Sequence, residues 1–159
     1  GEAHSSKICT NNFRQLEKIA LSKGIKDILD KDKQDLKYYY KKDHQYYPTL
    51  INEMKSDRTV YQWRRVYVRE NKSNLCPTLT ANMGTGGHNV PLIKDKYGIR
   101  KLTPAECARF QGFPKEFNFP KGMADSHCYK QAGNSVVVPV IKRIADEMAR
   151  VLDLKYKEK

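Results

Sequence analysis

Long apolar runs are missing from this sequence of 159 residues, and none approaches the roughly 20 consecutive apolar positions that a helix needs to cross a bilayer. The chain also opens without the basic and apolar pattern of a secretory signal. These absences exclude an integral membrane protein, and we expect a soluble, cytoplasmic chain.

Cysteine is sparse as well, with four residues and no CxxC pair. That spacing favours neither a zinc module nor a disulfide framework, so reduced thiols are expected. We interpret Cys76 and Cys107 as structural residues, the second as a small buried apolar side chain.

Acidic residues are outnumbered, because 18 Asp and Glu face 30 Lys and Arg and leave a net charge of +12. This surplus favours a polyanionic partner, since each neutralised phosphate releases condensed counterions. Charge alone leaves DNA, RNA, an anionic membrane and a merely solvated basic surface open.

The N-terminal third carries one helix signal and a long charged stretch. Asn12 is suited to cap a helix through Lys23, with Phe13 and Leu16 on one face and Gly24 as the stop. Residues 25–47 are mostly charged and rich in tyrosine, which indicates a linker with short packed pieces.

The central region, residues 59–93, is rich in β-branched and aromatic side chains. It predicts a strand pair around residues 59–61 and 66–68, and a further extended run at 77–81. Residues 84–87 then hold three glycines in four positions, which free the backbone to approach something closely. On the sequence alone, a plain hairpin turn is the competing interpretation.

The C-terminal third has the clearest local signals. Thr103 and Glu106 form a capping box, with Pro104 at the first helical position and Gly112 as the stop of a two-turn helix. After Pro139, apolar side chains trace one stripe of a longer helix, a face that must pack on something.

Three stretches taken together carry a family resemblance. They are QWRRVY (62–67) with PTLTA (77–81) and its glycine loop, then RKLTPAECARFQGFP (100–114), then YKQAGNSV (129–136). In this order and spacing they resemble the C-terminal part of the DNA cytosine-5 methyltransferases of the bacterial modification-methylase type, over roughly residues 55–152. The resemblance implies an α+β chain: a small β-rich DNA target-recognition domain plus the C-terminal segment of an α/β Rossmann-like domain that binds S-adenosylmethionine.

This organisation divides the chain into three parts. Residues 1–54 are expected to be an N-terminal helix and a linker, 55–99 the target-recognition core, and 100–159 the segment that packs on the catalytic domain.

The resemblance also implies which residues meet double-stranded DNA. Arg65 matches a guanine-reading arginine, whose planar fork donates two hydrogen bonds to O6 and N7. Gln62 matches the side chain that fills the gap left by a flipped-out base. Arg64 stands where one well-known type of the family has an acidic residue. The remaining candidates carry a hydroxyl or no side chain: Thr78, Thr80, Gly84, Gly86 and Gly87.

The last motif supplies the expected cofactor contacts. Asn134, Ser135 and Val136 match residues that line the pocket for S-adenosylmethionine and the cytosine, and Gly133 beside them permits a close approach. Without the resemblance, the same residues indicate a turn before a strand.

The family's nucleophile, acid and cofactor loop have no counterpart here: Pro-Cys, Glu-Asn-Val and Phe-x-Gly-x-Gly are all absent. We therefore expect no catalytic residue in this chain and no activity from the chain alone. Its first residue is Gly, which fits a fragment or one subunit of a split enzyme whose partner is the N-terminal catalytic half. A non-catalytic DNA-binding module on the same scaffold and a basic RNA-binding protein are the alternatives.

Overall fold

The structure, a computed structural model, describes residues 13–84 and 89–157, with side chains up to residue 153. The chain divides into two compact units: Leu21–Val138, and a second unit made of Gly1–Ala20 with Pro139–Lys159. No helix among the described residues is long and apolar enough to cross a membrane.

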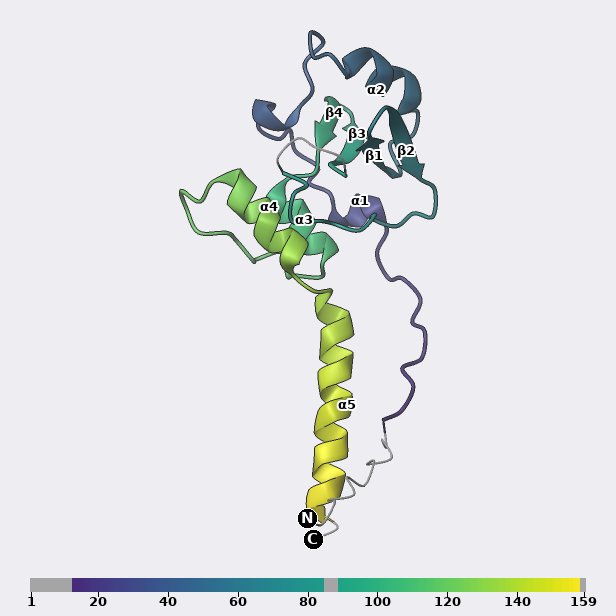
Figure 1. Cartoon of the computed structure of the whole chain (residues 1–159), viewed down its shortest axis with the longest axis vertical. Coiled ribbons are helices and arrows are strands. Elements are labelled where there is room, and N and C mark those ends of the chain that lie inside the picture. Colours follow the sequence, from purple (N-terminus) through teal and green to yellow (C-terminus); the bar gives the residue numbers. More distant parts are fainter. Residues whose placement is uncertain (1–12, 85–88, 158–159) are drawn as a thin grey trace, which may run out of the picture. The chain divides into compact units, whose positions relative to one another are not determined.

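A four-stranded antiparallel sheet lies at the centre of the Leu21–Val138 unit (Figure 1). Its strands are β1 (Val60–Arg64), β2 (Tyr67–Asn71), β3 (Pro91–Asp95) and β4 (Gly98–Lys101), in the order β2-β1-β3-β4. The strand pair expected around residues 59–68 is thereby confirmed. The extended run at 77–81 is not part of the sheet; it is irregular chain that leads into a turn.

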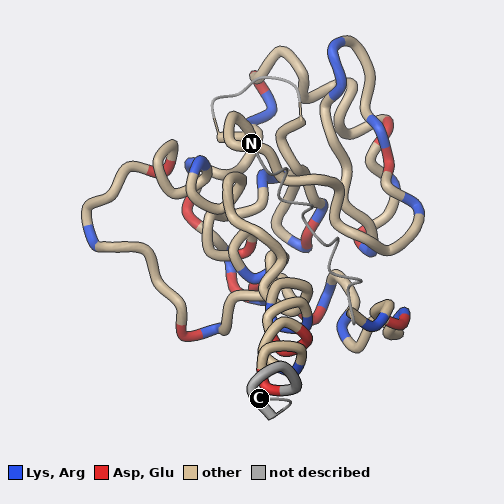
Figure 2. Tube along the Cα trace, turned by 60° about the horizontal axis from the view of Figure 1, so that its bottom comes forward, with Lys and Arg blue, Asp and Glu red and all other residues tan. Residues whose placement is uncertain are grey.

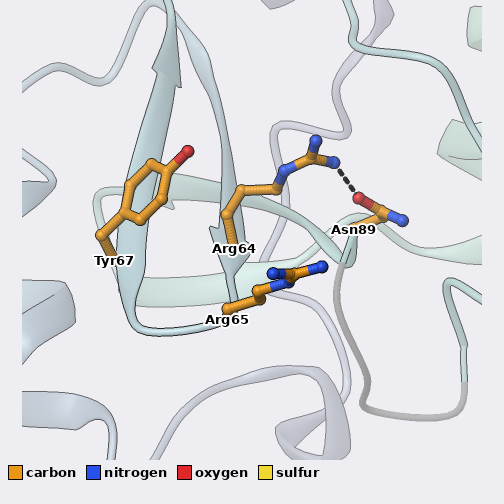
Figure 3. Close-up of a pocket in the computed structure, with 4 residues that line it drawn as sticks. All are labelled: Arg64, Arg65, Tyr67 and Asn89. Carbon is orange, nitrogen blue, oxygen red and sulfur yellow. Dashed lines mark hydrogen bonds between the residues drawn. The ribbon is translucent and has the colours of Figure 1, made fainter.

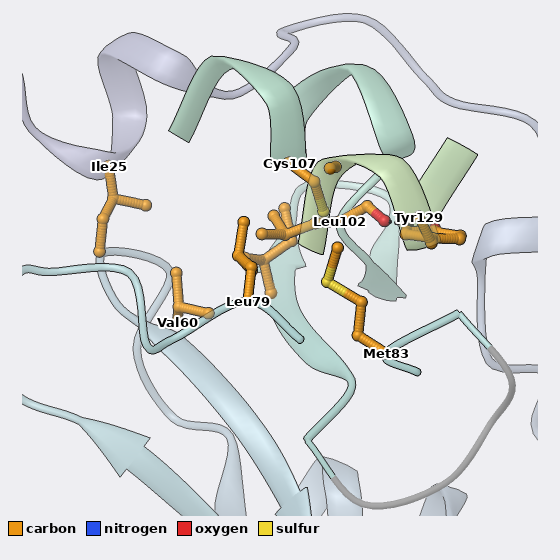
Figure 4. Packing of buried hydrophobic residues seen from close by; sticks show 9 residues of the cluster. Ile25, Val60, Leu79, Met83, Leu102, Cys107 and Tyr129 are labelled. Atoms are coloured by element: carbon orange, nitrogen blue, oxygen red, sulfur yellow. Dashed lines mark hydrogen bonds between the residues drawn. The ribbon is translucent and has the colours of Figure 1, made fainter. Parts of the chain in front are cut away.

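Helices cover both faces of this sheet. Side chains alternate between the two faces along each strand, so consecutive apolar residues need cover on both faces. Val60 belongs to one apolar cluster and the next residue, Tyr61, to the other. The first cluster packs the sheet against α1 (Ile25–Ile28), α3 (Pro104–Phe110) and α4 (Asp125–Asn134), and Figure 4 shows its side chains meeting. The second packs the sheet against α2 (Tyr47–Glu53). Mixed helices and an antiparallel sheet confirm the α+β class.

Helix α3 begins and ends where the sequence predicts. The Thr103 hydroxyl accepts a hydrogen bond from the Glu106 N–H (3.2 Å), and the Glu106 carboxylate accepts one from the Thr103 N–H (2.8 Å). At the other end Gly112 has φ +86°. The N–H of Phe113 donates to the Ala108 carbonyl at 3.1 Å, which is the closing bond of a Schellman motif.

A buried ionic network joins α3 to the sheet. The guanidinium of Arg100, on β4, is fully buried and donates to both carboxylate oxygens of Glu106 at 2.7 and 2.8 Å. Its Nε donates to Asp95 at 2.8 Å. Glu106 also accepts from the backbone N–H of Asp30 (3.0 Å), and Asp30 in turn receives a two-pronged ion pair from Arg109. The segment that enters the unit is therefore fastened to α3.

The helix predicted up to Lys23 is wrong within the described residues, because residues 13–23 are non-helical and α1 begins only at Ile25; its expected cap, Asn12, lies outside them. The apolar side chains of this stretch remain largely exposed, Ile19 for example at 69%. Amphipathic spacing alone does not hold a helix of this length, since most helical stability in proteins comes from packing.

Two other expectations change with the structure. Residues 133–134 end the ten-residue helix α4 rather than form a turn before a strand, and Ser135 is its C-cap. The expected boundary between residues 99 and 100 falls inside β4, which pairs with β3 and so extends the sheet to Lys101.

The tyrosines at 38–40 lie along the outer edge of β4. Tyr39 forms a β-bridge with Arg100 and donates its hydroxyl hydrogen to Asp95 (2.9 Å), while the Tyr40 N–H donates to the Ile99 carbonyl (2.9 Å). Residues 25–47 thus contain short packed pieces, as expected, and their role as a linker stays a prediction. These rings are partly buried and do not form the open stacking platform that an RNA-binding sheet presents.

In the second unit, α5 (Val138–Lys157) confirms the helix expected after Pro139. Its apolar stripe is exposed in this chain: Val140, Ile141, Ile144, Met148 and Leu152 each keep 40% or more of their surface accessible. Arg14 donates its backbone N–H to the Glu147 carboxylate at 2.6 Å.

Candidate functional site

Four of the eight predicted DNA-binding residues line one groove. A cavity of about 420 Å³, here called the hairpin groove, lies between the sheet and the irregular chain that follows β2. Gln62 and Arg64 reach it from β1, and Thr78 and Thr80 reach it from the following chain. Segments 14 or more residues apart thus present their polar side chains to a common space.

Beside it lies a second, more open cavity of about 470 Å³ at the β1–β2 turn, here called the tip pocket. It is lined by Arg64, Arg65, Tyr67 and Asn89. Figure 3 shows Arg64 and Arg65 extending to the same side, with the Arg64 guanidinium meeting the side chain of Asn89. Arg64 and Asn89 line both cavities, so the hairpin groove and the tip pocket form one continuous surface.

Arg65 occupies a strained position at the tip of the hairpin. Arg64 pairs with Tyr67, which leaves Arg65 and Val66 as a two-residue loop. Arg65 adopts φ +53°, a left-handed conformation that costs a non-glycine residue roughly 1–2 kcal/mol. Backbone strain of this kind is frequent at functional sites, where the position of the side chain serves the function.

Trp63 holds this tip in place. Its ring stacks on Tyr46, with centroids 4.3 Å apart and planes 23° apart, and its Nε1–H donates to the Arg65 carbonyl at 3.1 Å. The indole is therefore an anchor for the loop.

Asn89 connects the chain that precedes β3 to strand β1. The sequence analysis did not identify it as a site residue. Its N–H donates to the Trp63 carbonyl (3.2 Å), its carbonyl accepts from the Gln62 amide (3.4 Å), and its side-chain oxygen accepts from Arg64. It adopts φ +77°, which asparagine tolerates better than most residues. The signal in the sequence was an asparagine two residues after Gly87, at the end of a glycine-rich stretch.

Arg69 is a second residue that the prediction missed. It pairs with Gln62 across β1 and β2 and lines the hairpin groove. Cross-strand partners present their side chains to the same face, so a correct hairpin register would have placed it there. Arg64, Arg65 and Arg69 then make the surface strongly basic, and none of the lining residues described for the two cavities is acidic.

The 78–84 segment follows this basic surface and turns back towards α4. Thr78 is exposed, and Thr80 donates its hydroxyl hydrogen to the Asn82 side chain at 2.7 Å. Gly84 lies against the ring of Tyr129, so its missing side chain serves packing inside the chain. Gly86 and Gly87 lie outside the described residues.

The expected cofactor residues lie at the end of α4. Asn134 is exposed, and its side-chain amide has no hydrogen-bond partner within the described parts of the chain. Ser135 donates its hydroxyl hydrogen to the Ala132 carbonyl at 2.7 Å, and Val136 is 56% exposed. One open amide beside exposed aliphatic surface fits one wall of a pocket for a polar organic cofactor.

The thiols of the described residues are unsuited to nucleophilic chemistry. Burial raises the pKa of Cys76 to about 12 and raises that of Cys107 well above its usual value. Both side chains are therefore protonated at neutral pH, which agrees with their structural interpretation. No group of three or more metal-ligating side chains occurs among the residues that the structure describes.

Lysine and arginine are otherwise spread along the chain and interspersed with acidic residues (Figure 2). The net charge of +12 therefore does not by itself mark a binding face. The local signal is the set of arginines at the β1–β2 hairpin, where no acidic side chain is found among the described residues that line the cavities.

Comparison with known proteins gives a consistent result. The profile of the C-5 cytosine-specific DNA methylases matches residues 2–150. The type II methyltransferase M.Bsp6I of Bacillus sp. (strain RFL6) is 60% identical over 139 residues, which cover 86% of this chain and 43% of that protein. M1.ScrFI of Lactococcus lactis subsp. cremoris is 42% identical over 76 residues, covering 48% of this chain and 19% of that protein.

The chain thus spans less than half the length of the curated relatives it matches. The profile nevertheless covers almost all of it, and the stretches that carried the resemblance lie inside the match. This chain belongs to the C-5 cytosine-specific DNA methylase family.

Proposed function

We propose that this chain is the target-recognition part of a bacterial restriction-modification enzyme. That enzyme methylates C5 of a flipped-out cytosine in a specific duplex DNA site in the cytoplasm. The observation that carries the proposal is the convergence of Gln62, Arg64, Arg65, Thr78 and Thr80 on one basic surface. Family membership supplies the reaction class, and this surface supplies the contacts with DNA.

Arg65 is the proposed base reader. The hairpin projects it from a two-residue loop, and a guanidinium fork donates two parallel hydrogen bonds to guanine O6 and N7 in the major groove. Arg64 is held by Asn89 beside it and adds positive charge at the same place. Thr78, with an exposed side chain, is placed to donate its hydroxyl hydrogen to a phosphate.

Gln62 is proposed to stabilise the duplex after the cytosine leaves it. Its side chain is only 5% exposed, and its amide makes one long bond of 3.4 Å, to the Asn89 carbonyl. That weak bond is readily exchanged for the edge of an unpaired guanine. Extrusion of a base costs a few kcal/mol, and a side chain that takes over the lost pairing offsets part of that cost.

Asn134, Ser135 and Val136 are proposed to form one wall of the cofactor pocket, and the rest belongs to a Rossmann-like catalytic half. When bound, S-adenosylmethionine supplies the methyl group. The Asn134 amide would orient it as a hydrogen-bond donor and acceptor. The Ser135 oxygen remains able to accept, because its hydrogen is directed to Ala132.

The catalytic half itself is the proposed partner, either in the same polypeptide or as a separate subunit. The exposed stripe of α5 and the exposed Val136 and Val137 are the apolar surface that it would cover. The buried, protonated thiols described above leave the attack on C6 of cytosine to a thiolate of that half. The chain alone is then inactive.

A hybrid enzyme tests the assignment. The part of M.Bsp6I that this chain does not match is joined to the chain, and the hybrid is incubated with duplex DNA and tritiated S-adenosylmethionine. Label on cytosine from the hybrid, and none from the chain alone, is the expected result. A folded hybrid that binds DNA but transfers no label would favour a non-catalytic DNA-binding module instead.

The Arg65 assignment has its own matched comparison. In a library of duplexes, Arg65→Ala should lose discrimination at one base pair by about 1–3 kcal/mol. Arg58→Ala removes an equal charge from an exposed position of the same unit that lines neither cavity, and should weaken all sequences alike. Equal weakening of all duplexes by Arg65→Ala would refute base reading.

A further inference from the structure

Gly133, near the end of α4, lies directly on the backbone of the 78–84 segment. A Cβ atom placed on Gly133 would lie 2.3 Å from the carbonyl carbon of Thr80, 2.4 Å from its oxygen and 2.5 Å from the nitrogen of Ala81. These are backbone atoms, which cannot rotate out of the way as a side chain does. Only glycine allows α4 and this segment to lie so close together.

A second contact, one helical turn earlier on α4, is made with Gly84 at the C-terminal end of the same segment. The ring of Tyr129 lies where a Cβ on Gly84 would be, only 2.5 Å from its Cδ2 atom. Tyr129 is buried and cannot swing aside freely, because its hydroxyl hydrogen is donated to the Leu102 carbonyl at 2.6 Å. Positions 129 and 133 are four apart and share one helix face, so a single face of α4 contacts the segment at both Thr80 and Gly84.

The side chains between these two contacts also pack against α4. Leu79 and Met83 are buried in the same apolar cluster as Tyr129 and Ala132. Thr78 is exposed and Thr80 lines the hairpin groove. The segment therefore turns its apolar residues to α4 and its hydroxyls outwards, and the separation of helix and segment sets how far the hydroxyls protrude.

We propose that Gly133 is a positioning residue for DNA recognition, because its missing side chain lets α4 hold the 78–84 segment where Thr78 and Thr80 reach the duplex. The inference rests on the proposed function, since it takes these threonines to meet DNA. It gives Gly133 a different role from the sequence expectation of a close approach by a ligand. The residue that follows, Asn134, faces the proposed cofactor, so one helix end supports both binding surfaces.

The test compares Gly133→Ala with Gln131→Ala, an exposed position on the same helix, in the hybrid enzyme. To restore even 3.0 Å around a new Cβ, the Thr80 backbone must retreat by about 0.7 Å. We expect Gly133→Ala to weaken binding of the target duplex at least tenfold and to leave the affinity for S-adenosylmethionine within twofold of Gln131→Ala. Unchanged DNA binding, or an equal loss for both ligands, would overturn the proposal.

A measurement on the unsubstituted hybrid covers the case in which Gly133→Ala does not fold. Binding of the duplex without cofactor should slow hydrogen exchange at the amides of residues 133–135, through the seated segment. Slower exchange at residues 62–80 with no change at 133–135 would also overturn the proposal. A hybrid that binds no duplex would instead contradict the proposed function, so the two failures are distinguishable.

Discussion

Glu106→Gln should destabilise the chain more than most single substitutions. The carboxylate accepts two hydrogen bonds from the buried Arg100 guanidinium, one from the Thr103 N–H and one from the Asp30 N–H. Glu106→Gln replaces one carboxylate oxygen with an amide NH2, which is a donor and would face a donor already present. It also removes one of the two negative charges that balance Arg100, and the only one that is fully buried. The breaking of a buried ion pair costs about 3–5 kcal/mol, and a weakened helix cap adds about 1 kcal/mol.

Urea unfolding of the chain, followed by circular dichroism, measures this loss. Glu116→Gln is the matched control, because Glu116 is exposed and its side chain makes no hydrogen bond among the described residues. Folded domains have a free energy of unfolding of about 5–15 kcal/mol, so Glu106→Gln should leave the chain marginal or unfolded, whereas the control should change by less than about 0.5 kcal/mol.

A double variant separates the charge imbalance from the mere loss of contacts. With Arg100→Met and Glu106→Leu together, the buried Arg100–Glu106 pair is removed as a whole, and only Asp95, whose side chain is 19% exposed, loses an ionic partner. Apolar replacement of a buried ion pair is often neutral or stabilising. We expect the double variant to recover at least half of the stability that Glu106→Gln loses. A Glu106→Gln variant that loses less than 1 kcal/mol, or a double variant less stable than the single one, would refute this account.

Three further predictions concern the hairpin, Asn89, and the buried side chains of Cys76 and Tyr40. Because Arg65 has φ +53°, Arg65→Gly should unfold at a temperature several degrees above that of Arg65→Ala by calorimetry, although both lose the same base preference; equal melting would contradict the inferred strain. Asn89→Gly keeps the φ of +77° accessible but removes the acceptor for Arg64, so it should melt within about 2 °C of the parent and discriminate less between duplexes in a binding panel, whereas unchanged discrimination would count against the clamp. Burial raises the pKa of both Cys76 and Tyr40 to about 12, from ordinary values of 9.0 and 10.0. The unfolded chain then loses these protons first as the pH rises above about 9, so the urea midpoint should fall between pH 8 and 11, less steeply for Cys76→Val; a midpoint independent of pH would contradict the burial.

The parts of the fold that could be predicted from the sequence are those fixed by local chemistry. The Thr103–Glu106 box and Gly112 define α3 without help from distant residues. Enrichment in β-branched and aromatic residues was sufficient to predict the hairpin around residues 59–68, and an apolar stripe was sufficient for α5. The same kind of stripe failed for residues 13–23, whose apolar side chains remain largely exposed among the described residues.

The site could be predicted only in part from the sequence, because some of its contacts depend on how distant segments pack together. Asn89 and Arg69 were missed because their roles depend on register and on contacts across the sheet. The residues carried over from the family motifs remain predictions, although the structure gathers most of the DNA-binding set on one surface. The close seat of Gly133 on Thr80 is likewise set by packing between segments 53 residues apart in the chain.

Both ends of the Leu21–Val138 unit are tied to the same seven-residue helix. Near the N-terminal end of the unit, Arg109 of α3 forms an ion pair with Asp30. At the C-terminal end, the N–H of Val138 donates to the carbonyl of Gln111, the C-cap of α3, at 2.8 Å. The contacts that hold both ends of the unit therefore lie within the unit itself. Under the proposed function, residues 21–138 could therefore be exchanged between methylases to change the site that is read, with the contacts to α3 keeping the exchanged unit closed.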